Sequence, residues 1–571
     1  MHTLQVIRVD KGKVDLEDIF NKPREFNSVE DCQTFLQRQL LPSLQERGYL
    51  AASLDSIAYD SSITRSWVYA GERYTWGEIK FDTSLFQKEQ LEKWSDLFSF
   101  GGILNPKQLV DVQQKMLHYY ENHGYPFAVI KLDSSFFIDA ALHAVMKVFE
   151  GPLYHIDSIV IAGKVHVQPS FMEQYLGISA GSIYKADVLE SISKKIADLG
   201  FFREVKPWDL TLLGTGAKLN LYLESKQSSQ VNLLVGLMPA NAQLGGKLLL
   251  TGEANMELKN TFGGGESTLL NWQQIQVQSP RLLIAFQKPY LFKSNTGIDF
   301  QFNLFKKDSS FLTLNTKLGL QYSVNAKQLV KVFFKQFSSS LLDVDTNAIK
   351  ISKRLPSFMD IKTSNIGIEL QYRGTDNRYN PRAGVEFSST VEGGVRKIQP
   401  NMTITTMGKD HFDYSTLYDT IKLTSSQLKG LVKGDLFTKL GRQSTLKVGL
   451  QGGYIHSDKI FTNELFQLGG IKTLRGFDEE SIYASRFIIA TFEYRFLIGP
   501  SSYLFSFIDA AQTSRKTYQA AYNAKYVGAG LGISFETKSG IFSLAYAVGK
   551  QPEMALNFKQ AKIHFGFVSL F

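Results

Sequence analysis

Apolar and polar residues alternate along most of the chain after residue 227. In segment 312–324 the apolar side chains stand at even-numbered positions, namely Leu312, Leu314, Leu318, Leu320, Tyr322 and Val324. Segment 365–374 does the same with Ile366, Ile368, Leu370 and Tyr372. A period of two predicts β-strands with one apolar face. Many such strands, separated by Gly, Asn, Asp and Ser, predict a transmembrane antiparallel β-barrel with lipid outside and water inside.

The length of this region predicts the size of the barrel. Residues 227–571 number 345. A membrane-crossing strand takes about ten residues, so the region accommodates about sixteen strands with their turns and loops. No stretch of the chain approaches about 18 uninterrupted apolar residues, so we expect no transmembrane helix.

The strand expected at 526–537 contains a glycine pattern that imitates a cofactor motif. Its apolar residues Val527, Ala529, Leu531, Ile533 and Phe535 face one way, and Gly528, Gly530 and Gly532 face the other. "GAGLG" at 528–532 resembles a dinucleotide fingerprint, but no helical pattern follows it, so the strand interpretation is favoured. "FGGGES" at 262–267 lacks the Gly-Lys-Ser/Thr ending of a phosphate loop. With no HExxH motif and no histidine-rich cluster present, we expect no enzyme, metal or cofactor.

The first 226 residues contain three copies of one unit. Segments 41–57, 116–132 and 192–208 each run from a polar helix through Gly and an aromatic residue into a strand. Gly48, Gly124 and Gly200 recur every 76 residues and fit the left-handed position that ends a helix. Each copy then has an alternating strand, such as 141–151. The sequence therefore predicts three small α+β modules before the barrel.

Composition narrows the possible partners and compartments. The net charge of +9 is spread along the chain without a dense basic run, so we do not expect nucleic-acid binding. Cys32 is the only cysteine, which rules out an intrachain disulfide and a multi-cysteine metal site. The first 20 residues lack the features of a leader, so an outer-membrane location requires one that is absent from this sequence.

One arginine stands in an unusual setting at "FQLGGIKTLRGFDEES", residues 466–481. Arg475 follows Gly469 and Gly470 and precedes Gly476 and Phe477. If this permanently charged side chain is buried, it needs carboxylate partners; otherwise it is a surface loop residue.

The stretch "LGGIKTLRGF" resembles the loop-six motif of the BamA/TamA superfamily of outer-membrane assembly factors. In that family the loop folds into the barrel, and its arginine pairs with a glutamate and an aspartate on neighbouring strands. The matching residues here are Arg475, Gly476 and Phe477 in the loop, with Glu493 and Asp509 as the carboxylates. Alternation along 488–500 points Glu493 inward. Asp509 shares its parity with Phe505 and Phe507, so either aromatic residues line the interior there or a bulge intervenes.

Further segments carry the same resemblance. "TDNRYNPRAG" matches the family's D-x-R-x-x-P-x-x-G element at Asp376, Arg378, Pro381 and Gly384. "FGGGES" resembles the glycine-rich segment of an early hairpin, and "FQKPYLF" at 286–292 resembles the strand after it. The chain ends in the aromatic Phe571, which resembles the signal by which barrel proteins are recognised for insertion, although Ser569 departs from that pattern.

The three modules resemble POTRA domains, which we place at 1–71, 72–151 and 152–226, with the barrel at 227–571. A scaffold role for the modules stays open. Three such units resemble TamA more than BamA, and we see no plug helix of the kind that two-partner transporters have. The resemblance implies a location in the bacterial outer membrane with POTRA domains in the periplasm. It implies contact with outer-membrane lipid, nascent client proteins and a TamB-like partner, and insertion or export of clients without nucleotide hydrolysis.

The family also implies a weak seam where the first and last strands of the barrel meet. We place it between 230–239, with Leu233 and Gly236, and 562–571, with Phe565, Gly566 and Phe571. Ordinary barrel glycines would look the same at these two positions. Two alternatives of other classes remain, a passive channel or exporter gated by loop six, and a soluble β-rich binding protein.

Overall fold

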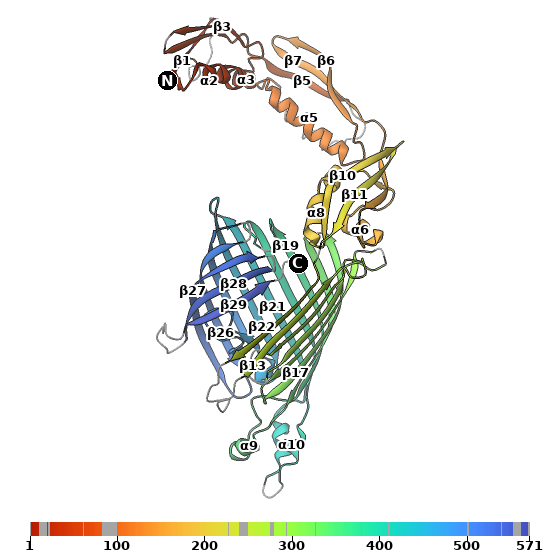
Figure 1. Ribbon diagram of the computed structural model, residues 1–571, viewed down its shortest axis with the longest axis vertical. Helices are drawn as coiled ribbons and strands as arrows, with labels where there is room; N and C mark the ends of the chain where they lie inside the picture. The colour runs from red at the N-terminus through yellow and green to blue at the C-terminus, as the bar shows by residue number, and fades with distance from the viewer. Residues whose placement is uncertain are drawn as a thin grey trace. The chain divides into compact units, whose positions relative to one another are not determined.

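The protein is described here by a computed structural model of the 571-residue chain (Figure 1). The structure describes residues 2–10, 20, 23–60, 62–82, 100–226, 228–238, 249–274, 279–292, 294–325, 327–377, 380–408, 412–499, 502–537, 540–551 and 561–568. These residues form two compact units. The first contains 1–160, 179–192 and 209–220, and the second contains 161–178, 193–208 and 221–571.

Three small sheets with helices occupy the N-terminal 226 residues. The first sheet has the order β2-β1-β4-β3, the second β5-β7-β6 and the third β10-β11-β8-β9. Their strands are β1 (His2–Arg8), β2 (Arg24–Phe26), β3 (Ser53–Asp60), β4 (Ile63–Tyr69), β5 (Thr75–Asp82), β6 (Val129–Ile138), β7 (Ala141–Phe149), β8 (His155–Ala162), β9 (Ser182–Ile183), β10 (Phe202–Leu213) and β11 (Gly216–Ser225). Their helices are α2 (Val29–Phe35), η1 (Leu36–Leu40), α3 (Leu41–Glu46), α5 (Pro106–Glu121), α6 (Pro169–Leu176), α7 (Ala186–Glu190) and α8 (Ile192–Leu199).

The glycines predicted to end helices do so in the conformation that requires glycine. Gly48, Gly124 and Gly200 have φ of 91°, 97° and 76°, a backbone conformation that residues with a Cβ rarely adopt. The alternating strand predicted at 141–151 is β7, in which Leu142, Ala144 and Met146 are buried. The mixed α+β fold of this region is therefore as predicted, while the boundaries at 71/72, 151/152 and 226/227 stay predictions. Within the described residues, no helix is both long and apolar enough to cross a membrane.

The C-terminal region forms the predicted barrel, a sixteen-stranded sheet that runs in chain order from β12 to β29 (Figure 1). Neighbouring strands of this sheet pair antiparallel. Its strands are β12 (Gln230–Met238), β13 (Leu249–Lys259), β14 (Ser267–Gln274), β15 (Arg281–Lys288), β16 (Thr296–Lys307), β17 (Phe311–Asn325), β18 (Gln328–Leu341), β19 (Ile361–Thr375), β20 (Gly384–Ile398), β21 (Thr424–Lys439), β22 (Ser444–Ser457), β25 (Arg486–Leu497), β26 (Tyr503–Lys516), β27 (Ala521–Thr537), β28 (Gly540–Lys550) and β29 (Lys562–Val568).

Side-chain exposure along the strands follows the predicted alternation. In β19, Ile366, Ile368 and Leu370 are exposed, whereas their neighbour Asn365 is buried. In β27 the exposed Val527 and Leu531 alternate with the buried Gly528. Apolar side chains therefore cover the outer face of the barrel, as a lipid-facing wall requires.

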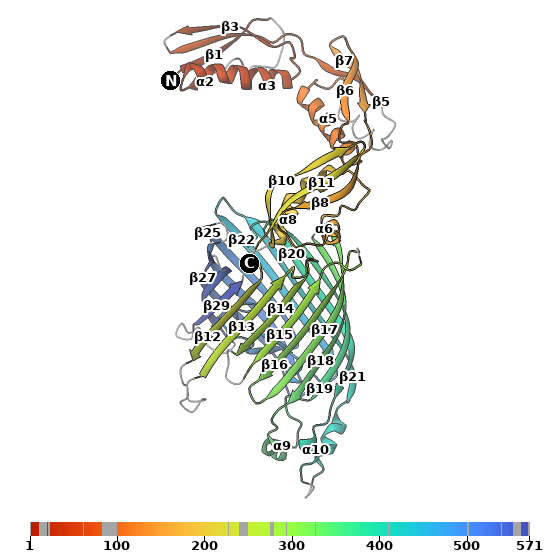
Figure 2. The ribbon, with the colours of Figure 1, turned by 45° about the vertical axis from the view of Figure 1, so that its right-hand side comes forward.

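Loops at one end of the barrel gather into a compact apolar cluster, here called the cap. It lies beyond the ends of β18–β21, where α9 (Thr346–Ser352) and α10 (Met402–Thr405) lie together (Figure 2). The helical turn η3 (Tyr414–Thr420) also belongs to it. Its buried members are Ile349, Leu355, Met359, Ile361, Ile398, Ile404, Met407, Tyr414, Leu417, Tyr418, Ile421 and Phe461. Because Phe461 comes from the segment after β22, the cap joins three inter-strand loops.

The glycine-rich segment 262–267 forms the turn between β13 and β14. Glu266 is buried and accepts hydrogen bonds from the backbone N–H groups of Phe262 and Gly264. Within the second compact unit, the backbone N–H of Gln168 donates to the Gly263 carbonyl over 2.8 Å. A Cβ on Gly265 would lie 2.1 Å from the Phe171 ring, so only glycine allows this approach to α6.

We predict that Gly384→Ala destabilises the barrel, because Gly384 has a φ of 111° and an added Cβ would lie 2.1 Å from the Gly374 carbonyl oxygen. The urea midpoint of the detergent-solubilised protein should fall, with a loss above about 1 kcal/mol in unfolding free energy. Gly441→Ala is the matched control, since open space surrounds that turn glycine. Equal midpoints for the two variants would contradict the prediction.

Candidate functional site

Residues 458–485, between β22 and β25, are called loop six here, and they fold back against the inner wall. The loop contains η4 (Thr462–Glu464) and a short hairpin of β23 (Phe466–Leu468) and β24 (Ile482–Ala484), which is separate from the sixteen-stranded sheet. Its buried residues Leu468, Leu474, Phe477, Ile482 and Ala484 pack with Phe487, Ile489, Ala511, Ala524 and Tyr526 of β25, β26 and β27. The loop is thus part of a hydrophobic core shared with the wall.

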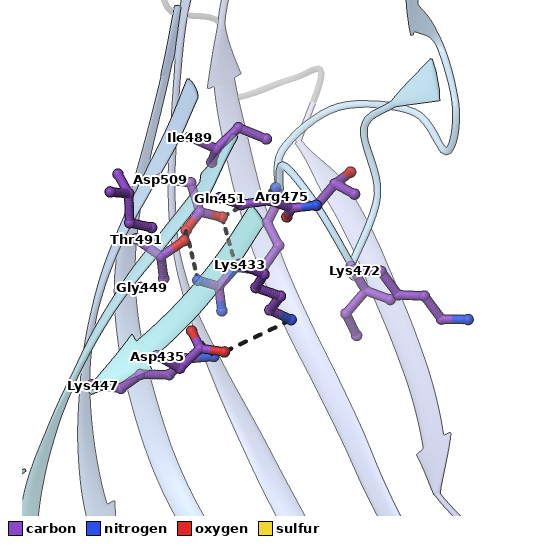
Figure 3. A pocket seen from close by; sticks show the side chains of 13 residues that line it. Lys433, Asp435, Lys447, Gly449, Gln451, Lys472, Arg475, Ile489, Thr491 and Asp509 are labelled. Atoms are coloured by element: carbon purple, nitrogen blue, oxygen red, sulfur yellow. Dashed lines mark hydrogen bonds and ion pairs between the residues drawn. The ribbon is translucent and has the colours of Figure 1, made fainter. Parts of the chain in front are cut away.

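Arg475 lies at the tip of loop six and binds two wall carboxylates, of which Figure 3 shows Asp509. Its Nε donates to Asp509 Oδ2 over 2.8 Å and its Nη2 to Asp509 Oδ1 over 2.7 Å, which makes a forked contact. Its Nη1 donates to Glu493 Oε2. Arg475 is 9% exposed, Glu493 5% and Asp509 1%, so the ion pairs are screened from bulk water. The structure therefore brings together the three residues that sequence reasoning placed in one site.

Aromatic side chains line the wall beside Asp509. Phe505, Phe507 and Asp509 are all buried, whereas Leu504 and Ile508 are exposed. The pairing of β25 with β26 runs without a register shift from Arg486↔Ser514 to Leu497↔Tyr503. Of the two alternatives for this strand, inward-facing aromatics are therefore present and a bulge is not. The Arg475 guanidinium lies 3.5 Å from the centre of the Phe507 ring, a cation–π arrangement that adds to the ion pairs.

The site extends along the wall as a chain of polar contacts. Arg495 Nε donates to Glu493 Oε1 over 2.8 Å, so Glu493 lies between two guanidinium groups. Thr491 Oγ1 donates to Asp509 Oδ1 over 2.9 Å, and the Arg475 backbone N–H donates to Asp509 Oδ2 over 3.2 Å. Each carboxylate oxygen of the pair therefore accepts at least one hydrogen bond, as buried carboxylates require.

Gly476 and Phe477 lie across the last three strands of the sheet. A Cβ on Gly528 of β27 would lie 1.9 Å from the Arg475 carbonyl oxygen. A Cβ on Gly549 of β28 would lie 2.5 Å from the Gly476 carbonyl oxygen. The Gly476 N–H donates to Nε2 of the buried His564 on β29 over 2.9 Å. The tip thus contacts β25 through β29 and reaches the strand that ends the sheet.

A small cavity of about 80 Å³ lies beside Arg475. Lysines 433, 447 and 472 line it together with Asp435, which pairs with Lys447 over 3.3 Å (Figure 3). Small-molecule sites usually enclose about 300 Å³ or more. The cavity is therefore a gap in the tip packing, and nothing about it indicates a ligand site.

The predicted D-x-R-x-x-P-x-x-G element forms the turn between β19 and β20. Asp376 Oδ1 accepts from the backbone N–H groups of Arg382 (2.9 Å) and Ala383 (3.1 Å). Burial acts to raise the pKa of Asp376, but these two N–H groups and Lys439 outweigh it and lower that pKa below its ordinary value. Pro381 is buried. Arg378 lies outside the described residues.

The turn also reaches the arginine site. Asn380 Oδ1 lies 3.4 Å from Arg495 Nη1, so the turn contacts the residue that supports Glu493. The spacing that sequence reasoning singled out thus belongs to a turn stabilised by its own aspartate and joined to the site by Asn380.

The predicted seam residues lie on the two terminal strands. Leu233 and Gly236 belong to β12 and pair with Ala254 and Thr251 of β13. Phe565 and Gly566 belong to β29 and pair with Leu544 and Ser543 of β28. Phe571 lies outside the described residues.

Sequence reasoning missed several contributors to the site, chiefly Thr491, Arg495, Gly549 and His564. The inward glycines of β27 were a signal that could have revealed the close contact. Added Cβ atoms at Gly530 and Gly532 would lie 2.8 Å and 2.3 Å from the rings of Phe507 and Phe505. A run of inward glycines opposite inward aromatics on the preceding strand thus marks where bulky groups need room.

Comparison with known proteins agrees with this architecture, since residues 260–568 match the Omp85 superfamily domain. The chain belongs to the Omp85 superfamily. This Omp85 protein is 22% identical over 439 residues to the outer membrane protein assembly factor BamA of Neisseria meningitidis serogroup B, covering 73% of this chain and 51% of BamA. It therefore spans about half the length of that relative. It is also 22% identical over 338 residues to a SAM50-like protein of Drosophila melanogaster, covering 56% of this chain and 70% of that one.

Solved structures share the fold of this Omp85 protein. CdiB from Escherichia coli superposes with a TM-score of 0.51 at 13% identity, covering 94% of this chain and 97% of CdiB. CdiB from Acinetobacter baumannii gives 0.50 at 14% identity, covering 95% and 99%. At these identities the likeness concerns the fold alone. The protein is thus a BamA/TamA-type member of the superfamily and resides in an outer membrane, which its barrel spans.

We predict that Asp509→Asn lowers the unfolding free energy of the barrel by about 3–5 kcal/mol, because it leaves the buried Arg475 without its forked carboxylate. The loss is measured from urea unfolding in detergent micelles. Asp435→Asn is the matched control, since Asp435 lies on the same cavity and pairs with lysines instead. A loss no larger for Asp509→Asn than for the control would refute an energetic role for the Arg475 pair.

Proposed function

We propose that this Omp85 protein inserts or exports β-rich client proteins at the outer membrane through a lateral seam of its barrel, without nucleotide hydrolysis. The observation that supports this best is the position of the loop-six tip. The tip contacts β25 through β29 and donates a hydrogen bond to His564 on the terminal strand. A tip in that position can hold the end of the sheet in place or release it.

The terminal strands supply the edge that such a mechanism needs. In the hydrogen-bonded order, β12 and β29 stand at the two ends of the sheet. Unpaired backbone groups in lipid cost several kcal/mol each, so an edge opened to the membrane strongly favours pairing with a further strand. A client segment in extended form can meet that demand by adding to the edge.

The second connection between loop six and the terminal strand is an ion pair. Lys562 Nζ of β29 lies 2.7 Å from Asp478 Oδ1, three residues beyond Arg475. Together with the Gly476–His564 hydrogen bond, it couples the tip to β29. We therefore infer that Arg475, Glu493 and Asp509 serve as the tether that sets the position of the tip, and that its release loosens β29.

The N-terminal modules receive clients or partners in this proposal. The three modules act as POTRA domains in the periplasm, and they comprise residues 1–71, 72–151 and 152–226. They bind extended client segments and a TamB-like partner that spans the periplasm. The assignment to a TamA-like rather than a BamA-like role belongs to the same proposal.

A second candidate function follows from the occupied interior. Since loop six packs against the inner wall, its removal would leave a wider lumen, as in a passive channel or a two-partner-type exporter. Single-channel recording in planar bilayers separates the two functions. A small flickering conductance fits an assembly factor, and a large steady pore fits a channel.

We predict that a disulfide across the seam blocks client insertion while the barrel stays folded. Cysteines replace Leu233 and, in separate variants, residues around Phe565, all in a Cys32→Ser background. The cross-linked strands cannot part to expose an edge. Client insertion into proteoliposomes is measured before and after reduction, and a heat-modifiable band on an unboiled gel reports the folded barrel.

The matched control is a disulfide inside the sheet, between cysteines that replace Leu304 and Leu314. These residues face each other in the β16–β17 pair, away from both terminal strands. This cross-link should leave insertion unchanged. Full insertion by the cross-linked seam variant would eliminate lateral opening.

We also predict that deletion of residues 1–71 weakens capture of client peptides while the barrel still inserts. This segment contains a complete sheet, β2-β1-β4-β3, with a core of its own, so its removal leaves the later sheets intact. Pull-down of extended client peptides by the two forms measures the effect. Undiminished capture by the shortened chain would count against a binding role for the first module.

A further inference from the structure

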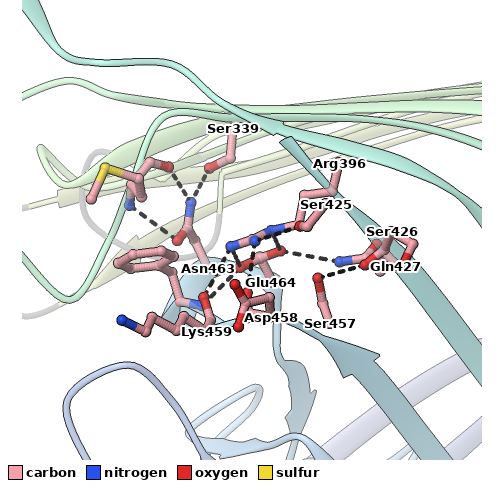
Figure 4. A network of polar contacts seen from close by, with 12 residues as sticks. Ser339, Arg396, Ser425, Ser426, Gln427, Ser457, Asp458, Lys459, Asn463 and Glu464 are labelled. Atoms are coloured by element: carbon pink, nitrogen blue, oxygen red, sulfur yellow. Dashed lines mark hydrogen bonds and ion pairs between the residues drawn. The ribbon is translucent and has the colours of Figure 1, made fainter. Parts of the chain in front are cut away.

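A second buried arginine meets loop six, and it comes from the wall instead of the loop. Arg396 of β20 is 0% exposed. Its five N–H donors all have acceptors (Figure 4): Glu464 Oε1 (2.6 Å), Glu464 Oε2 (2.9 Å), Ser425 Oγ (3.2 Å), and the carbonyl oxygens of Asp458 (2.9 Å) and Lys459 (3.1 Å). Three of the four acceptor residues belong to loop six. The start of the loop is therefore wrapped around one guanidinium group.

Glu464 is enclosed as completely as its partner. Oε1 also accepts from Gln427 Nε2 of β21 over 3.1 Å, and Oε2 from the Phe461 N–H over 2.7 Å. The polarity is opposite to that at the tip. There the loop supplies the arginine and the wall supplies the carboxylates, whereas here the wall supplies the arginine and the loop the carboxylate.

The residues next to Glu464 bind other parts of the wall and the cap. Asn463 Nδ2 donates to Ser339 Oγ of β18 and to the Met359 carbonyl, each over 2.7 Å. Thr462 accepts from Arg515 of β26 over 3.1 Å. Phe461 is buried in the cap. Residues 458–464, here called the limb, are thus fixed to four strands, β18, β20, β21 and β26, and to the cap.

Between the limb and the tip, the chain passes through β23 and then two glycines, and β24 follows after the tip. Gly469 and Gly470 have φ of 113° and 90°, and both come before Arg475. Glycine tolerates large changes of φ and ψ, so this is where the backbone can turn most readily.

We propose that Arg396 is a positioning residue that, with Glu464, anchors the limb independently of Arg475. Release of the tip then moves residues 469–481 about the paired glycines, while the limb and the cap keep their place. Two buried ion pairs of opposite polarity favour separate release, since opening both together would expose two sets of uncompensated charges. The proposal rests on the proposed function only for the release of the tip, and its test measures accessibility instead of client insertion.

The experiment places a reporter cysteine on each part in the full chain with Cys32→Ser. Thr462→Cys reports on the limb and Leu474→Cys on the tip, since both residues are buried. Labelling by a water-soluble maleimide is followed in folded, detergent-solubilised protein. Arg396→Met should raise the labelling rate at position 462 about tenfold or more and leave that at position 474 unchanged. Arg475→Ala should do the reverse.

Two further variants secure the interpretation. Glu464→Gln removes the charge and keeps one of the two oxygens that accept from the Phe461 N–H and Gln427, so it decides the outcome if Arg396→Met fails to fold. Arg382→Met is the matched control, because Arg382 likewise donates to two backbone carbonyls, those of Gly441 and Arg442, but outside loop six. It should change neither rate.

The pattern of labelling decides between two anchors and one. If either Arg396→Met or Arg475→Ala raises both rates alike, loop six moves as one body and the proposal is wrong. It is equally wrong if Glu464→Gln leaves position 462 as protected as in the parent. A seam disulfide that fails to block insertion would overturn the proposed function without affecting either result.

Discussion

The rest of the site depends on one interaction, the pairing of the permanently charged Arg475 with carboxylates inside the barrel wall. Arg475 cannot lose its proton, so its burial is tolerable only with carboxylates in contact. That need accounts for Asp509 and Glu493 on adjacent strands, and Glu493 in turn is shared with Arg495. The close approach of the tip then requires glycine at positions 528 and 549. One guanidinium group thus determines which residue types are needed at positions far apart in the sequence.

Much of the fold could be predicted from the sequence because its physical signals are local. Alternation of apolar residues, as in Ile366, Ile368 and Leu370, follows directly from the two faces of a strand. Glycines such as Gly124 indicate the end of a helix because few other residues adopt a positive φ. Arg475, Glu493 and Asp509 could be named together only because a family motif links them; periodicity alone left the direction of Asp509 open.

The remaining contacts could not be predicted, since they depend on which strands lie opposite a loop. His564 gives no signal of its own, being a single polar residue in an alternating strand. Arg396 and Glu464 are 68 residues apart and belong to no motif that would pair them. Their meeting depends on the fold of the limb and on the register of β20 with β21. Such long-range pairs become visible only when the strands of the sheet are paired and the loop is in place.

The inward glycines of β27 make the packing of that strand depend on its neighbours. A strand with Gly528, Gly530 and Gly532 loses more conformational entropy on ordering than one with side chains at those positions. The room that they leave is filled from elsewhere, by the rings of Phe505 and Phe507 and by the backbone of the loop tip. β27 therefore gains much of its packing from its neighbours and little from itself. It follows that the last strands and the loop tip complete each other's packing, and neither is fully packed without the other.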